Sequence, residues 1–250
     1  MDVALISLLF LKPLLDRDLL IKEDWKRFKN TDPRACLLDG RFLVVQENAN
    51  VMIYNTNVLP PAKVPQKWED LLNPEWKGQM CIPQTQIGAS VVFEIWDESK
   101  AVKYLEALGK QQLIVESGAN TTLPRCANGE VALANTYMSQ VPLWKAKGQP
   151  IDATPISPQW NAPQGAYSVK GLPHPNAAKL FTAWLITPEG QAAMMQTGRG
   201  RSSPCNASET AKLLCDKGIK LINADTMEKA MRQDALIERT RKILGLKPPS

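Results

Sequence analysis

The sequence predicts an α/β protein with a largely parallel or mixed sheet. Two observations support this prediction: short β-rich segments alternate with segments of helical periodicity, and polar loops lie between them. The length of 250 residues suits one large domain or two lobes of about 100–150 residues each. A hydrophobic content of 44% and a charged content of 22% are ordinary for a folded globular protein.

The predicted strands are short and rich in β-branched residues. Arg41 to Asn57 contains two such pieces, FLVVQ and NVMIYNT, after the turn at Asp39-Gly40. Val3 to Phe10 is an apolar run that predicts either a buried strand or the start of a helix. The remaining predicted strands are 80–82, 113–116, 131–135, 151–156 and 166–169.

Helical spacing of apolar residues is clearest in the second half of the chain. Ala101, Val102, Leu105 and Leu108 recur at the spacing of one helix face. The predicted helices are 68–72, 100–110, 123–128, 176–185, 189–197 and 226–244, the last without an identified packing partner.

Polar loops follow or precede the predicted strands. These loops are Thr85 to Ser90, Ala119 to Thr122, Asn135 to Tyr137, and Trp160 to Ala166, the last overlapping a Pro-, Gln- and Asn-rich loop over 157–165. In α/β proteins ligands bind where such loops converge at the carboxyl ends of strands. The sequence therefore predicts a ligand crevice formed by these loops.

The inventory of reactive residues argues against catalysis and against a metal site built from His and Cys. His174 is the only histidine, which makes a Ser-His-Asp triad improbable and excludes a His-rich metal site. P-loop, GxGxxG and HExxH motifs are absent from the sequence. The net charge of +5 is mild and its basic residues are scattered, so no nucleic-acid partner is expected. No cofactor, catalytic residue or metal ligand is predicted.

Five cysteines occur without CxxC spacing, so no zinc or redox motif is indicated. The simplest interpretation is five free, mostly buried thiols, although Cys205 and Cys215 could bridge in an oxidising compartment. The opening MDVALISLLFLKPLL lacks a basic start and a small-x-small cleavage site, so it is interpreted as part of the fold, and no signal peptide is visible.

Four phrases together resemble one family. They are KVPQKWEDLLNPEWKGQMCIP at 63–83, NGEVALANTYM at 128–138, AKGQP at 146–150 and HPNAAKLFTAWLITPEGQ at 174–191. Their order and spacing are similar to those of the periplasmic solute-binding proteins of ABC importers, in the group that binds iron and related solutes. The resemblance covers about residues 2–205.

This resemblance implies a two-lobed type II periplasmic-binding fold with mixed sheets. VMIYNT at 51–56 resembles the strand that crosses between lobes, and a second crossing is expected near 164–170. The N-terminal lobe would comprise 1–50 and 166–205, the C-terminal lobe 51–165, and residues 206–250 would add helices that pack on the lobes. Members usually carry a β-α-β unit before the segment that begins here near Asp2, so the N-terminal lobe is expected to be incomplete.

The candidate ligand-binding residues lie on the polar loops: Thr85, Gly88, Ser90, Thr121, Asn135, Tyr137, Trp160 and Gly165. Thr85, Gly88 and Ser90 could offer hydroxyl and backbone N–H donors to an anion at a helix start, or simply cap that helix. Trp160 could form a wall of the cleft or a buried anchor. Ferric-binding relatives carry two consecutive tyrosines where this chain has Thr136-Tyr137, so bare Fe(III) is not the expected ligand. Two interpretations of Tyr137 stay open, a contact with the ligand and a half-buried aromatic residue of the core.

The function implied by the resemblance is that of the extracytoplasmic, periplasmic substrate-binding component of an ABC import system. The ligand would be a small anionic or anion-bearing solute or a metal chelate, held in the inter-lobe cleft, and the protein partner an ABC permease. A complete protein would be a monomer. The alternative is a shortened, non-transport relative that acts as a sensor or interaction protein.

Overall fold

The computed structural model describes residues 2–28, 31–85, 87–202 and 205–247. Its strands are β1 Ala4–Ser7, β2 Cys36–Leu37, β3 Phe42–Asn55, β4 Met80–Pro83, β5 Ile114–Glu116, β6 Leu133–Tyr137, β7 Ile151–Ala153, β8 Gln159–Tyr167 and β9 Leu221–Asn223. Its α-helices are α1 Lys12–Asp16, α2 Glu98–Gly109, α3 Ala119–Ala127, α4 Gln140–Ala146, α5 Pro175–Leu185, α6 Pro188–Met195, α7 Glu209–Asp216 and α8 Met227–Ile243. Short 3₁₀ helices include η1 Leu8–Leu11, η6 Trp68–Leu72 and η8 Gly88–Glu94.

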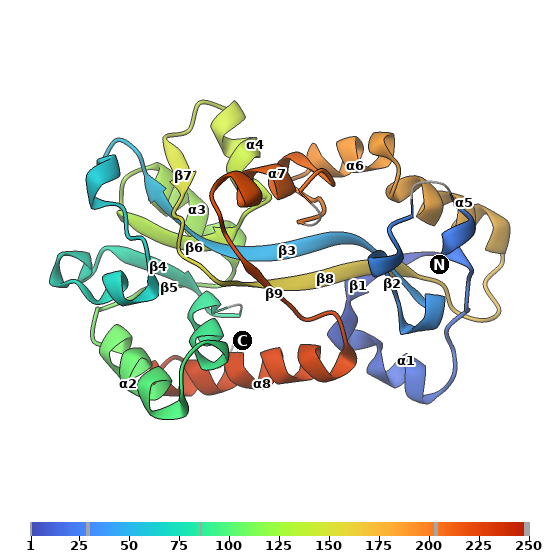
Figure 1. The fold of residues 1–250 in the computed structure, drawn as a ribbon, viewed down its shortest axis with the longest axis horizontal. Helices are drawn as coiled ribbons and strands as arrows, with labels where there is room; N and C mark the ends of the chain where they lie inside the picture. The colour runs from blue at the N-terminus through green and yellow to red at the C-terminus, as the bar shows by residue number, and fades with distance from the viewer. Residues whose placement is uncertain (1, 29–30, 86, 203–204, 248–250) are drawn as a thin grey trace.

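These strands form one mixed sheet with the main order β1-β8-β3-β6-β4-β5, and outside this order β2 and β7 pair with β3, and β9 pairs with β8. The β3 strand pairs antiparallel with β8 over one part of its length and with β6 over the other, whereas β4 runs parallel to both β5 and β6. Figure 1 shows β3 and β8 lying side by side along the long axis, with groups of helices at both ends. The predicted mixed sheet is therefore present.

The buried residues divide into clusters that the two long strands connect. Phe42 to Val45 of β3 belong to the cluster that also holds Leu8, Leu11 and Ala166, whereas Met52 and Trp160 belong to a second cluster with Trp68 and Leu105. A third cluster covers the opposite face of the second part of the sheet, with Leu123, Val141 and Leu214 from α3, α4 and α7. The β3 and β8 strands thus cross between two packed bodies, which form the two lobes of the fold.

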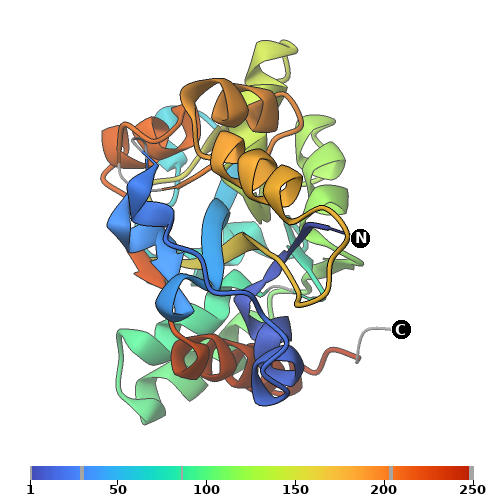
Figure 2. The same cartoon turned by 90° about the vertical axis from the view of Figure 1, so that its right-hand side faces the viewer.

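The C-terminal helix α8 has packing partners that the sequence does not identify. Ala230 is buried in the cluster of Leu8 and Phe42, and Ile237 and Leu244 are buried in the cluster of Trp68. Figure 2 shows α8 beside the helical turns near the N-terminus, and Figure 1 shows it extending along the lower edge towards α2. The helix therefore spans both lobes.

Two segments that the sequence predicts as loops are regular structure. Residues 119–122 form the first turn of α3, which Thr121 stabilises because its hydroxyl accepts a hydrogen bond from Gly118 N at 3.2 Å. The Pro- and Gln-rich segment 157–165 lies largely in β8, because β3 supplies an antiparallel partner from Ala49 to Leu43 that outweighs the low strand propensity of proline. Likewise, FLVVQ and NVMIYNT form one continuous strand instead of two.

The interpretation of all five cysteines as free thiols is wrong for one pair. Cys205 and Cys215 form a disulfide, since the turn before α7 brings residues ten positions apart into contact. Cys36, Cys81 and Cys126 are free. Burial raises the pKa of both the Cys81 and the Cys126 thiols to about 12, so these two side chains pack as small apolar groups.

Candidate ligand-binding cleft

A cavity of about 410 Å³ lies where the two lobes and the crossing strands meet. Its walls come from β1 and η1 on one side, from the middle of β3 and β8, and from the buried side of α8. Its polar lining consists of Ser7, Asn50, Thr85, Gln164, Gln233 and Asp234. Apolar side chains such as Leu9, Phe10 and Ile237 fill the rest, as in most small-molecule sites.

Asn50 lies on β3 at the point where its neighbour changes from β8 to β6. Its backbone pairs with Tyr137, and its side chain is only 3% exposed. The Oδ1 atom has no hydrogen-bond partner among the described residues. Protein atoms cover this oxygen almost completely, so Asn50 lines the cavity through its other atoms.

Gln164 lies on β8 directly opposite Ser7 of β1. Its Oε1 atom accepts a hydrogen bond from Gln46 Nε2 at 3.0 Å, and the same nitrogen donates to Asn48 Oδ1 at 3.1 Å. Since this network occupies the Gln164 oxygen, the side-chain nitrogen of Gln164 is left as its donor.

Asp234 is the ionisable side chain among the described lining residues, and it is exposed on α8. Partial burial raises its pKa, the Glu238 carboxylate raises it further, and Arg241 lowers it. Arg241 itself donates to Gln84 O at 3.1 and 2.9 Å and pairs with Glu238. Asp234 therefore lines the cavity without forming an ion pair among the described residues, although the charge of Arg241 acts on its carboxylate.

The structure places Thr85 on the cavity wall, but Gly88 and Asn135 lie below the surface. Gly88 N donates to Asn135 Oδ1 at 3.2 Å, and Asn135 Nδ2 donates to Val51 O at 3.0 Å. This pair joins the start of η8 to β6 and β3. The Gln86 part of the predicted Thr85–Ser90 loop lies outside the described residues.

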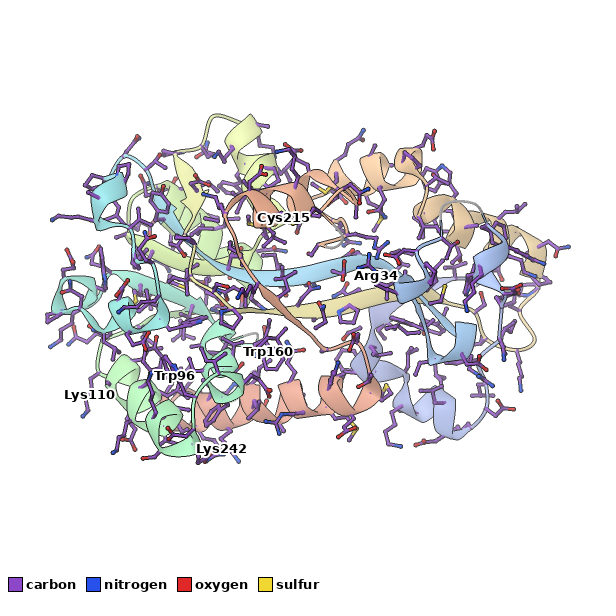
Figure 3. The ribbon with its side chains drawn as sticks, viewed as in Figure 1. Arg34, Trp96, Lys110, Trp160, Cys215 and Lys242 are labelled. Carbon is purple, nitrogen blue, oxygen red and sulfur yellow. A yellow bond between two sulfur atoms is a disulfide. The ribbon has the colours of Figure 1, made fainter. Side chains whose placement is uncertain are left out.

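Ser90 and Trp160 meet in the core of the second lobe. Trp160 is 2% exposed, and its Nε1 atom donates to Ser90 Oγ at 2.9 Å. Figure 3 places the Trp160 side chain below β8, beside the η8 segment. The geometry matches the buried-anchor interpretation of Trp160, and a ligand contact by either residue stays a prediction.

Thr121, Tyr137 and Gly165 are not among the residues that line this cavity. Thr121 is exposed at the start of α3, where its hydroxyl donates to Gly118 O at 2.7 Å. Tyr137 is half-buried at the end of β6, and burial raises the pKa of its phenol. Gly165 is buried in β8 against β3, next to the lining residue Gln164, and Tyr137 pairs with the lining residue Asn50. A ligand contact by any of these three residues stays a prediction.

The described residues contain no group of three or more His, Cys, Asp or Glu side chains placed to hold a metal ion. A long apolar helix able to cross a bilayer is likewise missing from the part of the chain that the structure describes.

Several lining residues are absent from the sequence-based candidates. Ser7 is the last residue of β1. Thr85 was selected because it follows a predicted strand, and Ser7 would have been selected in the same way if Val3 to Phe10 had been assigned as a strand. Asn50 and Gln164 lie within strands, and Asp234 lies within a helix. No local pattern marks these three residues, because they reach the cavity only through the packing of β3, β8 and α8.

Comparisons with known proteins agree with this architecture. The model of a family described as bacterial extracellular solute-binding protein matches residues 10–217. An uncharacterized protein of Haemophilus influenzae is 26% identical over 189 residues, which cover 71% of this chain and 54% of that protein. The chain therefore spans about half the length of this relative.

Solved structures match over nearly the whole chain. Iron-bound HitA from Pseudomonas aeruginosa has a TM-score of 0.70 at 22% identity, covering 96% of this chain and 82% of that one. AfuA from Actinobacillus pleuropneumoniae, bound to fructose-6-phosphate, has a TM-score of 0.72 at 21% identity, covering 98% and 83%. The substrate-binding protein of an ABC transporter from Agrobacterium tumefaciens has a TM-score of 0.73 at 16% identity, covering 97% and 79%. At these identities the likeness shows the fold, and it confirms the predicted two-lobed type II architecture.

Proposed function

This chain belongs to the bacterial extracellular solute-binding protein family, and on that premise we propose that it is the periplasmic substrate-binding component of an ABC importer. The cavity between the lobes would hold the solute, and an ABC permease would receive it. The family is defined by solute binding, which agrees with the prediction of a binding protein and not an enzyme. We further propose the lobe boundaries given above, 1–50 with 166–205 and 51–165.

The observation that carries this proposal is the composition of the cavity wall. Ser7 comes from one lobe, Thr85 from the other, and Asn50 and Gln164 from the crossing strands. A ligand that touches all of these groups would favour one relative position of the lobes. Such coupling between ligand binding and lobe position is what a receptor needs to signal its loaded state to a permease.

The ligand class expected from the sequence is a small anion-bearing solute or a metal chelate. One solved structure with this fold is described as bound to fructose-6-phosphate, which is an anion-bearing solute, and another is described as bound to iron. The described part of the cavity wall offers an anionic group neutral hydrogen-bond donors, the Ser7 and Thr85 hydroxyls and the Gln164 amide. A cavity of about 410 Å³ suits a molecule of metabolite size.

Filling the cavity should abolish binding. We expect thermal-shift measurements with a panel of amino acids, sugar phosphates, thiamin and ferric citrate to identify at least one stabilising solute. At a free concentration of a hundred times its Kd, this solute should raise the free energy of unfolding by about 2.7 kcal/mol. Ser7→Trp should remove the shift because its side chain occupies the cavity, whereas Ser99→Trp, on an exposed position of α2, should retain it. A panel without any stabilising solute, or unchanged binding by Ser7→Trp, would contradict the proposal.

Titration with ferric citrate should give no tyrosinate-to-iron absorption band in the visible range. The chain has Thr136 where ferric-binding relatives have the first of two tyrosines, and burial raises the pKa of Tyr137, which disfavours its phenolate. A strong band that disappears in Tyr137→Phe would overturn this expectation. Tyr167→Phe is the matched control at a second half-buried tyrosine.

A further inference from the structure

We propose that two copies of this chain associate through the first lobe, by pairing the edges of their β1 strands and packing together the exposed apolar sides of their α5 helices. The proposal goes beyond solute binding and does not depend on it, because the α5 side chains that carry it do not line the cavity. It concerns the chain of 250 residues, whereas the monomer expected from the sequence concerned a protein with a complete first lobe.

The first supporting observation is that α5 is apolar on two sides. One side packs into the first lobe and is buried at Ala178, Thr182, Ala183 and Leu185. The other, which we call the outer side of α5, consists of Leu180, Phe181 and Trp184, and all three are exposed. The rings of Phe181 and Trp184 stack there with their centroids 5.9 Å apart. Because a helix that is hydrophobic all round is usually buried, the outer side indicates a contact with another molecule.

The second observation is the free edge of the sheet at β1. This strand is the last in the main order of the sheet, and among the described residues it pairs with β8 alone. Natural proteins usually protect such an edge with lysine, proline or a bulge, but Ala4–Ser7 contains neither a charged residue nor a proline. The edge is therefore able to accept a further strand. Its four residues supply few hydrogen bonds, so a stable contact also needs the outer side of α5.

The edge of β1 and the outer side of α5 lie at the same end of the molecule. His174, the residue before α5, has its Nδ1 atom 3.1 Å from an oxygen of Asp2, two residues before β1. Figure 2 looks onto the first lobe and shows β1 and α5 together at this end. A single partner can therefore touch both.

A second copy of the chain satisfies both features with one symmetry operation. A twofold axis perpendicular to the sheet brings the two β1 strands together as antiparallel neighbours, which extends the sheet across the contact. The same axis keeps both α5 helices on the same face of the joined sheet, so that their outer sides can pack together. Each apolar patch then meets an identical patch, as in other isologous dimers.

The charges on this face suit a partner of the same kind. Lys179 is the charged residue of α5, and its Nζ atom lies 2.8 Å from a carboxylate oxygen of Glu23. Lys170, in the segment before α5, pairs with Asp18 at 2.6 Å. Because these charges are paired within each copy, they neither select a strongly charged partner nor repel a second copy.

The exposed apolar area also fits a dimer contact. A fully covered aromatic side chain buries about 150–250 Å², so Phe10, Phe181 and Trp184, which are 62%, 48% and 41% exposed, offer roughly 300 Å² together. Leu5 and Leu180 are exposed as well and add to this area. A standard interface buries about 800 Å² per partner, slightly more than half of it apolar. These five side chains thus supply most of the apolar area that such a contact needs.

Sedimentation analysis of the whole chain over a series of concentrations tests the proposal. We expect a species of twice the 27.7 kDa of one chain at micromolar concentration. Phe181→Glu and Trp184→Glu should each raise the Kd of the dimer by about tenfold or more, because each places a charge among the apolar groups that the contact covers. Leu5→Lys should also weaken the dimer, since lysine on an edge strand opposes pairing. Circular dichroism checks that the variants remain folded.

Val58→Glu is the matched control, because it places the same charge at an apolar side chain that is 50% exposed on the second lobe. It should leave the dimer unchanged. The proposal is overturned if the chain sediments as a monomer throughout, if the α5 variants dimerise normally, or if Val58→Glu weakens the dimer equally.

Two further results would assign this face to another occupant and also overturn the proposal. One is a monomer that binds vesicles of phosphatidylcholine and phosphatidylglycerol and loses this binding in Trp184→Glu. The other is a monomeric longer chain in which a preceding segment covers β1 and α5. Phe181→Glu and Trp184→Glu should bind solute as the unchanged chain does, because neither residue lines the cavity. Failure of the dimer would therefore leave the proposed function standing.

Discussion

Trp68→Ala should lower the free energy of unfolding by about 3 to 5 kcal/mol, the largest effect that we expect from a single substitution. Trp68 is 2% exposed and lies in the cluster that holds Met52, Leu105 and Trp160. Removing the indole leaves a large cavity, and it also removes the donor to Pro158 O, which Trp68 Nε1 contacts at 3.2 Å. Chemical denaturation followed by circular dichroism measures the loss.

Trp184→Ala is the matched control, because this tryptophan is 41% exposed on α5. The substitution should lower the free energy of unfolding by only about 1 kcal/mol, because Trp184 buries less apolar area than Trp68 does. If the two variants lose the same stability, the cluster around Trp68 is not the principal core of the second lobe.

Gly165→Ala should destabilise the chain by about 2 to 3 kcal/mol, although the change adds a single methyl group. A Cβ atom at this position would lie 2.6 Å from Leu43 O and 2.6 Å from the Phe42 ring. The carbonyl belongs to the β3 backbone, so the methyl group fits only if β3 and β8 move apart. Because Gln164 and Ser7 are adjacent to this contact, we also expect weaker ligand binding.

Gly118→Ala controls for the change of residue type. Gly118 lies before α3 with a φ of −162°, and a Cβ atom there would meet no atom within 4 Å. The variant should lose less than about 1 kcal/mol. Equal stability of Gly165→Ala and the unchanged protein in urea denaturation would contradict the close contact between the two crossing strands.

The sequence by itself determined the fold class and the family of this protein. Both conclusions rest on local features, namely the alternation of strands and helices and the phrases at 63–83 and 174–191. These features depend on neighbouring residues, so they can be recognised without the tertiary structure. The same is true of the Thr85 loop, because a polar residue after a buried strand marks the edge of a sheet.

Only the tertiary structure decided which polar side chains share a cavity. Asn50, Gln164 and Asp234 are far apart in the sequence and lie inside regular elements, so no turn or strand-end signal marks them. Conversely, Ser90, Asn135 and Trp160 follow the sequence rule for site residues, yet they are buried and bonded to protein groups. The physical reason is that cavity lining depends on how whole strands and the helix α8 pack against one another. Those contacts arise from burial between residues distant in the chain, which local sequence patterns do not encode.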